Sequence, residues 1–175
     1  IDEKIDTGAI LLQKKVEIHD GDSAGMLYDK LIDEGAKLTL KTIDQIAKHS
    51  IKAKHQEKDS SQLKNAPKLN RDNTRIKWNN NNIKIRQFIL GLSPYPSAWT
   101  ILLYGEKELN FKIHDAILSS LNLKPGAIEI TKNQFFVGCL GGSIELKEVQ
   151  LEGKKRMKVS DLINGSPFIK FCKFL

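Results

Sequence analysis

The short motif Asp6-Thr7-Gly8 near the start of the chain contains the residue type best suited to chemistry. A carboxylate in a glycine-containing turn can orient a catalytic base, or it can simply satisfy the backbone donors of that turn. The cysteines and histidines give no comparable pattern, because none has a second cysteine or histidine at metal-ligand spacing. We therefore expect no metal site, and we expect Cys139 and Cys172 to be buried free thiols.

Aspartic proteases are one alternative, because their active site is a pair of Asp-Thr-Gly motifs that share one proton. This chain has a single such motif, so a protease would have to be a symmetric dimer. Lys4 also stands just before the motif, where those proteases have the apolar residues of a buried strand. Both observations disfavour proteolysis.

The first 50 residues resemble the end of an α/β layer. Apolar residues at 9–13 and 16–18 predict strands, and the apolar spacing after Ser23 predicts two short helices broken at Gly35. A lone strand cannot form a sheet, so we expect its partners to precede Ile1. The chain also opens without Met or a signal peptide, which favours Ile1 as an interior position of a longer protein.

The rest of the chain predicts a linker followed by a second domain. Residues 50–73 contain little to bury, and the apolar spacing of 85–92 then predicts a helix that begins near Asn79 to Asn82 and is stopped by Pro94. Short strands are expected at 100–104, 109–113, 127–130, 134–137 and 143–151, with a hairpin turn at Gly105-Glu106, and Ser160 is expected to cap a last helix containing Leu162 and Ile163. Regularly spaced short strands favour a small, nearly closed barrel, since closure removes sheet edges.

Charge is distributed unevenly between these two parts. Residues 1–50 hold 7 lysines and 10 acids, whereas residues 51–175 hold 21 lysines or arginines and 11 acids, a net charge of +10. Distributed cations of this kind favour a polyanionic partner such as RNA, although an idle basic surface has the same composition. No apolar run is long enough to cross a bilayer, so no membrane partner is expected.

The string from Ile1 to Gly8, with Glu3 three positions before Asp6, resembles the folate-dependent formyltransferases. Further strings resemble the methionyl-tRNA formyltransferases among them, in the right order and across nearly the whole chain: Leu27 to Leu31, Thr74 to Trp78, Ile85-Arg86, Leu92 to Trp99, Lys124 to Gly126, Lys154 to Met157 and Asp161 to Ile163. Any one of these strings would be weak evidence, but together they are specific.

The resemblance implies transfer of a formyl group from 10-formyltetrahydrofolate to the amino group of methionyl-initiator tRNA. It makes Asp6 the catalytic aspartate, which positions and tunes a histidine, while an asparagine stabilises the developing oxyanion. The family places that asparagine and histidine in an Asn-x-His string followed by Ser-Leu-Leu-Pro-x-x-Arg-Gly, and neither string occurs here. We therefore expect this chain alone to be inactive but able to bind tRNA.

The same resemblance assigns the remaining site residues. The loop Asp2, Glu3, Lys4 and Ile5 is expected beside the folate, mainly through main-chain groups. Binding of tRNA phosphates is expected from Lys84, Arg86, Lys154, Lys155, Arg156 and Lys158. Trp78 and Trp99 are interpreted as buried core residues rather than base-stacking platforms.

The expected fold is thus an α+β fragment: the tail of a Rossmann-like α/β formyltransferase domain (1–50), a basic linker (51–72) and an OB-like β-barrel (73–175). The protein is expected to be cytoplasmic and monomeric. Two alternatives stay open, a related formyltransferase acting on a nucleotide sugar or another amine, and a stand-alone RNA-binding barrel.

Overall fold

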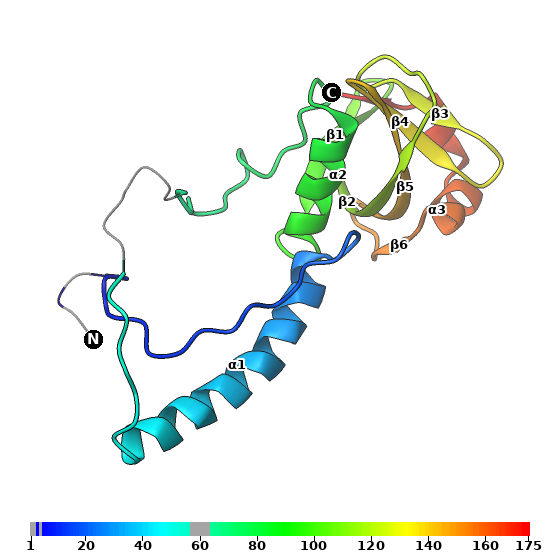
Figure 1. Ribbon diagram of the computed structural model, residues 1–175. Coiled ribbons are helices and arrows are strands. Elements are labelled where there is room, and N and C mark those ends of the chain that lie inside the picture. Colours follow the sequence, from blue (N-terminus) through cyan, green and yellow to red (C-terminus); the bar gives the residue numbers. More distant parts are fainter. Residues whose placement is uncertain (1–2, 4, 57–63) are drawn as a thin grey trace. The chain divides into compact units, whose positions relative to one another are not determined.

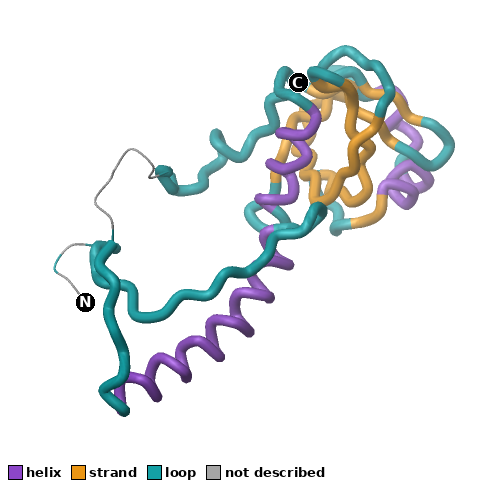
Figure 2. Tube along the Cα trace, in the orientation of Figure 1, coloured by secondary structure: helices purple, strands orange, loops and turns teal. Residues whose placement is uncertain are grey.

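The computed structural model describes residues 3, 5–56 and 64–175. It divides into two compact units, which we call the helical unit (Ile1–Asp20 and Met26–Lys68) and the barrel unit (Gly21–Gly25 and Leu69–Leu175). Figure 1 follows the chain from blue to red, and Figure 2 separates its helices from its strands. Each unit is described by itself.

The helical unit is built on one long helix, α1 (Ala24–Ala47), none of whose residues is buried. Among the described residues of this unit, one isolated backbone bridge joins two other segments, where Ile10 and Lys54 exchange N–H···O bonds of 2.8 and 2.9 Å. The carboxylate of Glu34 accepts hydrogen bonds from Lys14 and from Lys37, the latter at 3.0 Å. In its described residues, this unit is held together mainly by exposed polar contacts.

Two expectations for this region are wrong. Gly35 does not break the helix, because one glycine costs only about 1 kcal/mol and a helix of this length tolerates that. The expected strands at 9–13 and 16–18 do not form either, and the described residues of this segment pair only at Ile10. A ladder needs a partner strand, and none lies beside them in the described part of the chain.

The barrel unit contains seven antiparallel strands, and the expectation of a nearly closed, OB-like barrel is confirmed. Their order in the sheet is β3-β4-β5-β2-β1-β7, with β6 paired to β5. The strands are β1 (Ala98–Tyr104), β2 (Lys107–Ser119), β3 (Ile128–Ile130), β4 (Phe135–Cys139), β5 (Gly142–Leu151), β6 (Met157–Lys158) and β7 (Lys173–Phe174). The predicted β1–β2 hairpin is present, and Gly105 supplies the positive φ of 59° that its turn requires.

Helices cover the barrel where its interior would otherwise open to solvent. Helix α2 (Asn82–Leu92) begins at Asn81, whose side chain accepts a hydrogen bond from the backbone N–H of Ile83, and it packs against β2 (Figure 1). Helix α3 (Val159–Gly165) is followed by the short 3-10 helix η2 (Pro167–Phe171). Ser160 does not cap α3, because Lys158 occupies the N-cap position, whereas Leu162 and Ile163 are buried as predicted.

Aromatic rings fill the centre of the barrel. Phe174 of β7 stacks on Trp78 with ring centroids 5.3 Å apart and on Phe135 at 5.8 Å, and Phe111 lies against both phenylalanines. The indole N–H of Trp78 donates to the hydroxyl of Thr100 at 3.2 Å. Trp78 is therefore a core residue, as the sequence predicted.

Candidate nucleic-acid interface

Asp6 lies in an exposed turn of the helical unit and has a positive φ of 58°. The side-chain amide of Gln56 donates to the carbonyl oxygens of Asp6 and Gly8, at 3.0 and 2.7 Å. Among the described residues, no histidine or asparagine side chain forms a hydrogen bond with Asp6. In the described residues, the Asp6 carboxylate is thus exposed to solvent.

The expected folate loop is only partly described. Glu3 and Ile5 are exposed, whereas Asp2 and Lys4 lie outside the described residues.

The basic run at the end of β5 is less uniform than its sequence suggests. Lys154 donates to the hydroxyl of Ser166 at 3.3 Å, and the guanidinium of Arg156 binds the carboxylate of Glu148. Lys155 and Lys158 are exposed, and the structure gives them no carboxylate partner among the described residues. These two lysines are the members of the run best placed to meet a phosphate.

Helix α2 carries the other two predicted cations, in different surroundings. Lys84 is exposed and lines a cavity of about 370 Å³ together with Arg75 and Lys77. Arg86 is half-buried, and its Nε donates to the carbonyl oxygen of Ala116 at 3.3 Å. Lys84 therefore lies in a basic groove, while Arg86 also helps to hold α2 on β2.

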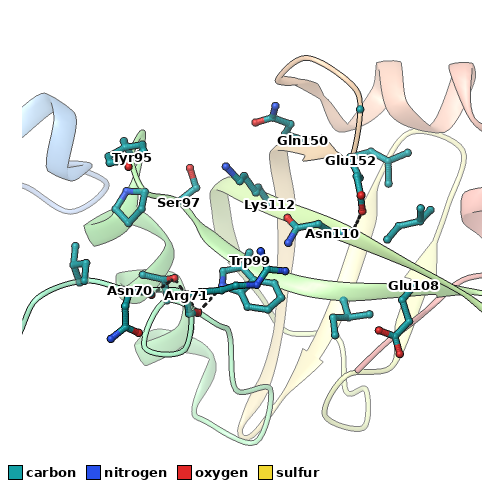
Figure 3. A pocket seen from close by; sticks show the side chains of 17 residues that line it. Asn70, Arg71, Tyr95, Ser97, Trp99, Glu108, Asn110, Lys112, Gln150 and Glu152 are labelled. Atoms are coloured by element: carbon teal, nitrogen blue, oxygen red, sulfur yellow. Dashed lines mark hydrogen bonds between the residues drawn. The ribbon is translucent and has the colours of Figure 1, made fainter.

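A larger cavity, of about 710 Å³, opens on the outer face of β1, β2 and β5 (Figure 3). Backbone pairing explains which side chains meet there: Trp99 lies opposite Lys112, and Lys112 lies opposite Gln150. The next row places Ile101 opposite Asn110, and Glu108 follows one row further along β2. The loops 69–74 and 95–97 close one side of this cavity, which we call the outer-face pocket.

Trp99 forms the floor of the outer-face pocket rather than a free platform. The guanidinium carbon of Arg71 lies 4.2 Å from the ring centroid, and the indole N–H donates to the backbone carbonyl of Arg71 at 2.9 Å. Trp99 is 8% exposed. The tryptophan thus fixes Arg71 over the sheet by a cation–π contact and a hydrogen bond.

Charge in the outer-face pocket is polarised. Arg71 and Lys112 lie toward the Trp99 end, and the structure gives neither a carboxylate partner among the described residues (Figure 3). Glu108 and Glu152 lie toward the other end, where the carboxylate of Glu152 accepts the backbone N–H of Asn110 at 2.6 Å. An anionic group is therefore favoured at one end and a hydrogen-bond donor at the other.

Sequence reasoning missed this pocket. It interpreted Trp99 as a buried core residue, which is correct, but it gave no role to Tyr95, whose side chain is 85% exposed on the pocket rim. The β1–β2 hairpin was predicted, and its register places Lys112 beside Trp99. That register, extended to β5, is the sequence feature from which the pocket residues could have been found.

One histidine is buried close to this region. His114 lies within 3.4 Å of the hydroxyl of Ser97, measured to its Nδ1. Burial lowers the pKa of His114, and the charge of Arg156 lowers it further, while Gln150 and Glu148 act in the opposite direction. The ring is therefore held in its neutral form near pH 7, and it tethers β2 to the loop that carries Tyr95.

The two cysteines are buried, and the described side chains that could bind a metal ion do not gather at one place. Cys139 and Cys172 are buried and unpaired as predicted, and burial raises the pKa of Cys139 to about 12. In residues 3, 5–56 and 64–175, no cluster of three or more His, Cys, Asp or Glu side chains is placed to hold a metal ion. No helix in those ranges is both long and apolar enough to span a membrane.

Comparison with known proteins gives consistent results. Residues 68–167 match the family described as formyl transferase, C-terminal domain. Methionyl-tRNA formyltransferase of Flavobacterium psychrophilum is 39% identical over 98% of this chain and 55% of its own length. The corresponding protein of Chlorobium limicola is 36% identical over 94% of this chain and 52% of its own length, so the chain spans about half the length of the curated relatives it matches.

Solved structures share the fold at lower identity. HypX from Aquifex aeolicus in complex with tetrahydrofolic acid superimposes with a TM-score of 0.67 at 17% identity, over 97% of this chain and 29% of HypX. The N-formyltransferase from Helicobacter canadensis gives 0.62 at 20% identity, over 90% of this chain and 53% of that protein. At these identities the likeness concerns the fold alone.

Proposed function

Because the chain belongs to the formyl transferase family through its C-terminal domain, we propose that it is the C-terminal part of a methionyl-tRNA formyltransferase. The intact enzyme would transfer a formyl group from 10-formyltetrahydrofolate to the amino group of methionyl-initiator tRNA. One observation carries this proposal: identity to the methionyl-tRNA enzymes reaches 39% and extends over both units of the chain.

Asp6 is the proposed contribution of the helical unit to chemistry. In the intact enzyme its carboxylate would orient a histidine supplied by another part of the protein, so that the ring can take the proton from the attacking amine. The exposure of Asp6 here fits a residue whose partners come from elsewhere. The loop Asp2 to Ile5 is proposed to lie beside the folate.

The proposed division of the protein follows from the same reasoning. Residues 1–50 would complete an α/β domain, residues 51–72 would link it to the barrel, and residues 73–175 would bind tRNA. Helix α1 supports the assignment of residues 1–50 to a larger domain, because it exposes apolar side chains at Leu31, Leu40 and Ile43. We propose that the remainder of the α/β domain covers them in the intact protein.

The barrel is proposed to hold tRNA mainly through its phosphates. Support comes from Lys84 in a basic groove and from the exposed Lys155 and Lys158. Such contacts displace condensed counterions and provide affinity without reading sequence.

Binding of the 175-residue chain to tRNA across a salt series tests the proposal. We expect affinity to fall steeply as salt increases, because each phosphate contact contributes a slope of about 0.9 in log K against log salt. A nucleotide-sugar enzyme should show almost no salt dependence and should bind a dTDP-sugar instead. Absence of tRNA binding at low salt would overturn the proposal.

A formylation assay separates the enzyme from its fragment. We expect no transfer from 10-formyltetrahydrofolate to methionyl-tRNA by the chain alone, since its sequence lacks the Asn-x-His string that would supply the catalytic asparagine and histidine. In the intact protein, Asp6→Asn should abolish most of the activity and leave tRNA affinity unchanged. Activity of the isolated chain would contradict the role proposed for the missing residues.

A further inference from the structure

The outer-face pocket offers more specific chemistry than a phosphate-binding surface. Its volume of about 710 Å³ falls within the roughly 300–1,000 Å³ of small-ligand sites. Its floor is Trp99 under the guanidinium of Arg71, and its rim carries the exposed ring of Tyr95. A pocket with fixed charges and a free aromatic ring suits a ligand that is both planar and anionic.

The spacing along β2 separates the two charged ends. Lys112, Asn110 and Glu108 occupy alternate positions, so their side chains lie on the same face at intervals of about 7 Å. Along the strand, Glu108 is therefore about 13 Å from Lys112, and Glu152, which pairs with Asn110, is about 7 Å from it. A phosphate, sugar and base laid end to end can bridge these distances.

The two ends select different parts of such a ligand. Arg71 and Lys112 can bind a phosphate, and Tyr95 can stack on a base, which is how proteins hold single-stranded nucleic acid. Glu108 and Glu152 are exposed carboxylates that accept hydrogen bonds only. They favour bases with an exocyclic amino group, namely adenine, cytosine and guanine, over uracil, which has none.

A double helix fits this arrangement poorly. Phosphates spaced along a duplex backbone and crossing the whole pocket would meet Glu108 and Glu152, which repel them. Paired bases would also keep their amino groups and ring faces away from the carboxylates and Tyr95. The polarity of the pocket favours one nucleotide that has left its stack.

We propose that the outer-face pocket holds one unpaired RNA nucleotide with an amino-bearing base, its phosphate on Arg71 and Lys112 and its base toward Glu108 and Glu152. Tyr95 lies on the other side of the two cations and stacks on the base of the neighbouring nucleotide. This assignment rests on the proposed function, since it takes tRNA as the source of the nucleotide. The proposed pocket adds a base preference to tRNA binding, because contacts with phosphates alone do not distinguish between sequences.

The experiment measures binding of the 175-residue chain to RNA hexamers of adenosine, cytidine or uridine, and to AMP. The adenosine and cytidine hexamers should bind on the order of tenfold more tightly than the uridine hexamer. Tyr95→Ala should weaken the adenosine hexamer on the order of tenfold. Phe171→Ala is its matched control, because Phe171 is 77% exposed elsewhere on the barrel unit and should have no effect.

A second pair of variants tests the phosphate end. Lys112→Gln should weaken the adenosine and cytidine hexamers severalfold, whereas Lys170→Gln, which removes the same charge from an exposed position on η2, should not. Equal effects within either pair, or equal affinity for all three hexamers, would overturn the pocket assignment. If AMP binds as tightly as the adenosine hexamer, the pocket is a site for free nucleotides, and the proposal that its ligand is part of an RNA is overturned.

Failure of this proposal can be distinguished from failure of the proposed function. If the chain binds tRNA with steep salt dependence but all four variants behave alike, the pocket assignment falls and the function stands. If the chain does not bind tRNA at low salt, the proposed function itself falls.

Discussion

The helical unit and the barrel unit place their apolar side chains differently. Helix α1 has no buried residue over 24 positions, whereas the barrel buries a continuous core around Phe111, Phe135 and Leu146. Both stretches contain enough apolar residues to form a core, so the difference lies in the partners that the described chain supplies. The barrel contains its own covering elements, whereas α1 leaves apolar side chains such as Leu31, Leu40 and Ile43 exposed.

The largest test of this comparison truncates one large apolar side chain in each unit. Phe111→Ala should lower the free energy of unfolding by about 3–5 kcal/mol, because the ring is fully buried among aromatic neighbours. Leu40→Ala on α1 should change it by less than about 0.5 kcal/mol, since Leu40 is 67% exposed. Urea unfolding is followed by far-ultraviolet circular dichroism, which detects α1, and by tryptophan fluorescence, which detects the barrel unit because Trp78 and Trp99 both lie there. Equal losses of stability would break the comparison.

The second test adds one methyl group to the closely packed backbone of β4 in the barrel. Gly138→Ala should destabilise the barrel by about 2–3 kcal/mol, because the new Cβ would lie 2.1 Å from the carbonyl oxygen of Lys124 and the backbone must move. Gly91→Ala in α2 is the control, because its Cβ would meet nothing within 4 Å and alanine favours a helix. A Gly138 variant as stable as the native chain would show that the loop at 123–124 can move away from β4 at no cost.

The third test concerns charge. Replacing Lys84, Lys155 and Lys158 together by Gln should reduce the salt slope of tRNA binding by about 1 for each phosphate that the variant no longer binds. The matched control replaces Lys41, Lys48 and Lys52 of the helical unit, which changes the net charge equally. A similar reduction in both would indicate that overall charge, and not the barrel surface, governs binding.

The smallest expected effect concerns pH. Burial lowers the pKa of His114, so the unfolded chain takes up its proton at a higher pH than the folded barrel does. Stability should therefore be unaffected by this residue above its ordinary pKa of about 6.5 and should decline as the pH falls below it. His114→Gln should flatten that decline, and urea unfolding at pH 7.5 and 5.5 measures the change. An unchanged decline would assign the pH dependence to other groups.

The sequence was most informative where local rules and tertiary packing agree. Asn81 caps α2 and Gly105 turns the first hairpin, and both positions follow from backbone requirements that few residues meet. Gly35 was misleading, because glycine lowers helix stability without forbidding a helix. Strands β6 and β7 have two residues each, too short for any alternation to be recognised.

The candidate site was less predictable than the fold. Lys154 and Arg156 looked equivalent to Lys155 in the sequence, and only the structure shows their contacts with Ser166 and Glu148. Partners such as these come from distant strands and helices, which single-sequence patterns do not reveal. The outer-face pocket was missed for the same reason, since Trp99, Lys112 and Gln150 meet through register across three strands.

Strand β7 has a consequence for how the protein is made. Leu102 of β1 pairs with Phe174, whose ring is part of the central aromatic stack. A ribosome synthesises β1 long before it reaches residue 174. The barrel core therefore stays incomplete until β7 has been synthesised and can pair with β1. Barrel folding should therefore finish only after synthesis of this segment, and a nascent chain stalled before Lys173 should remain sensitive to protease.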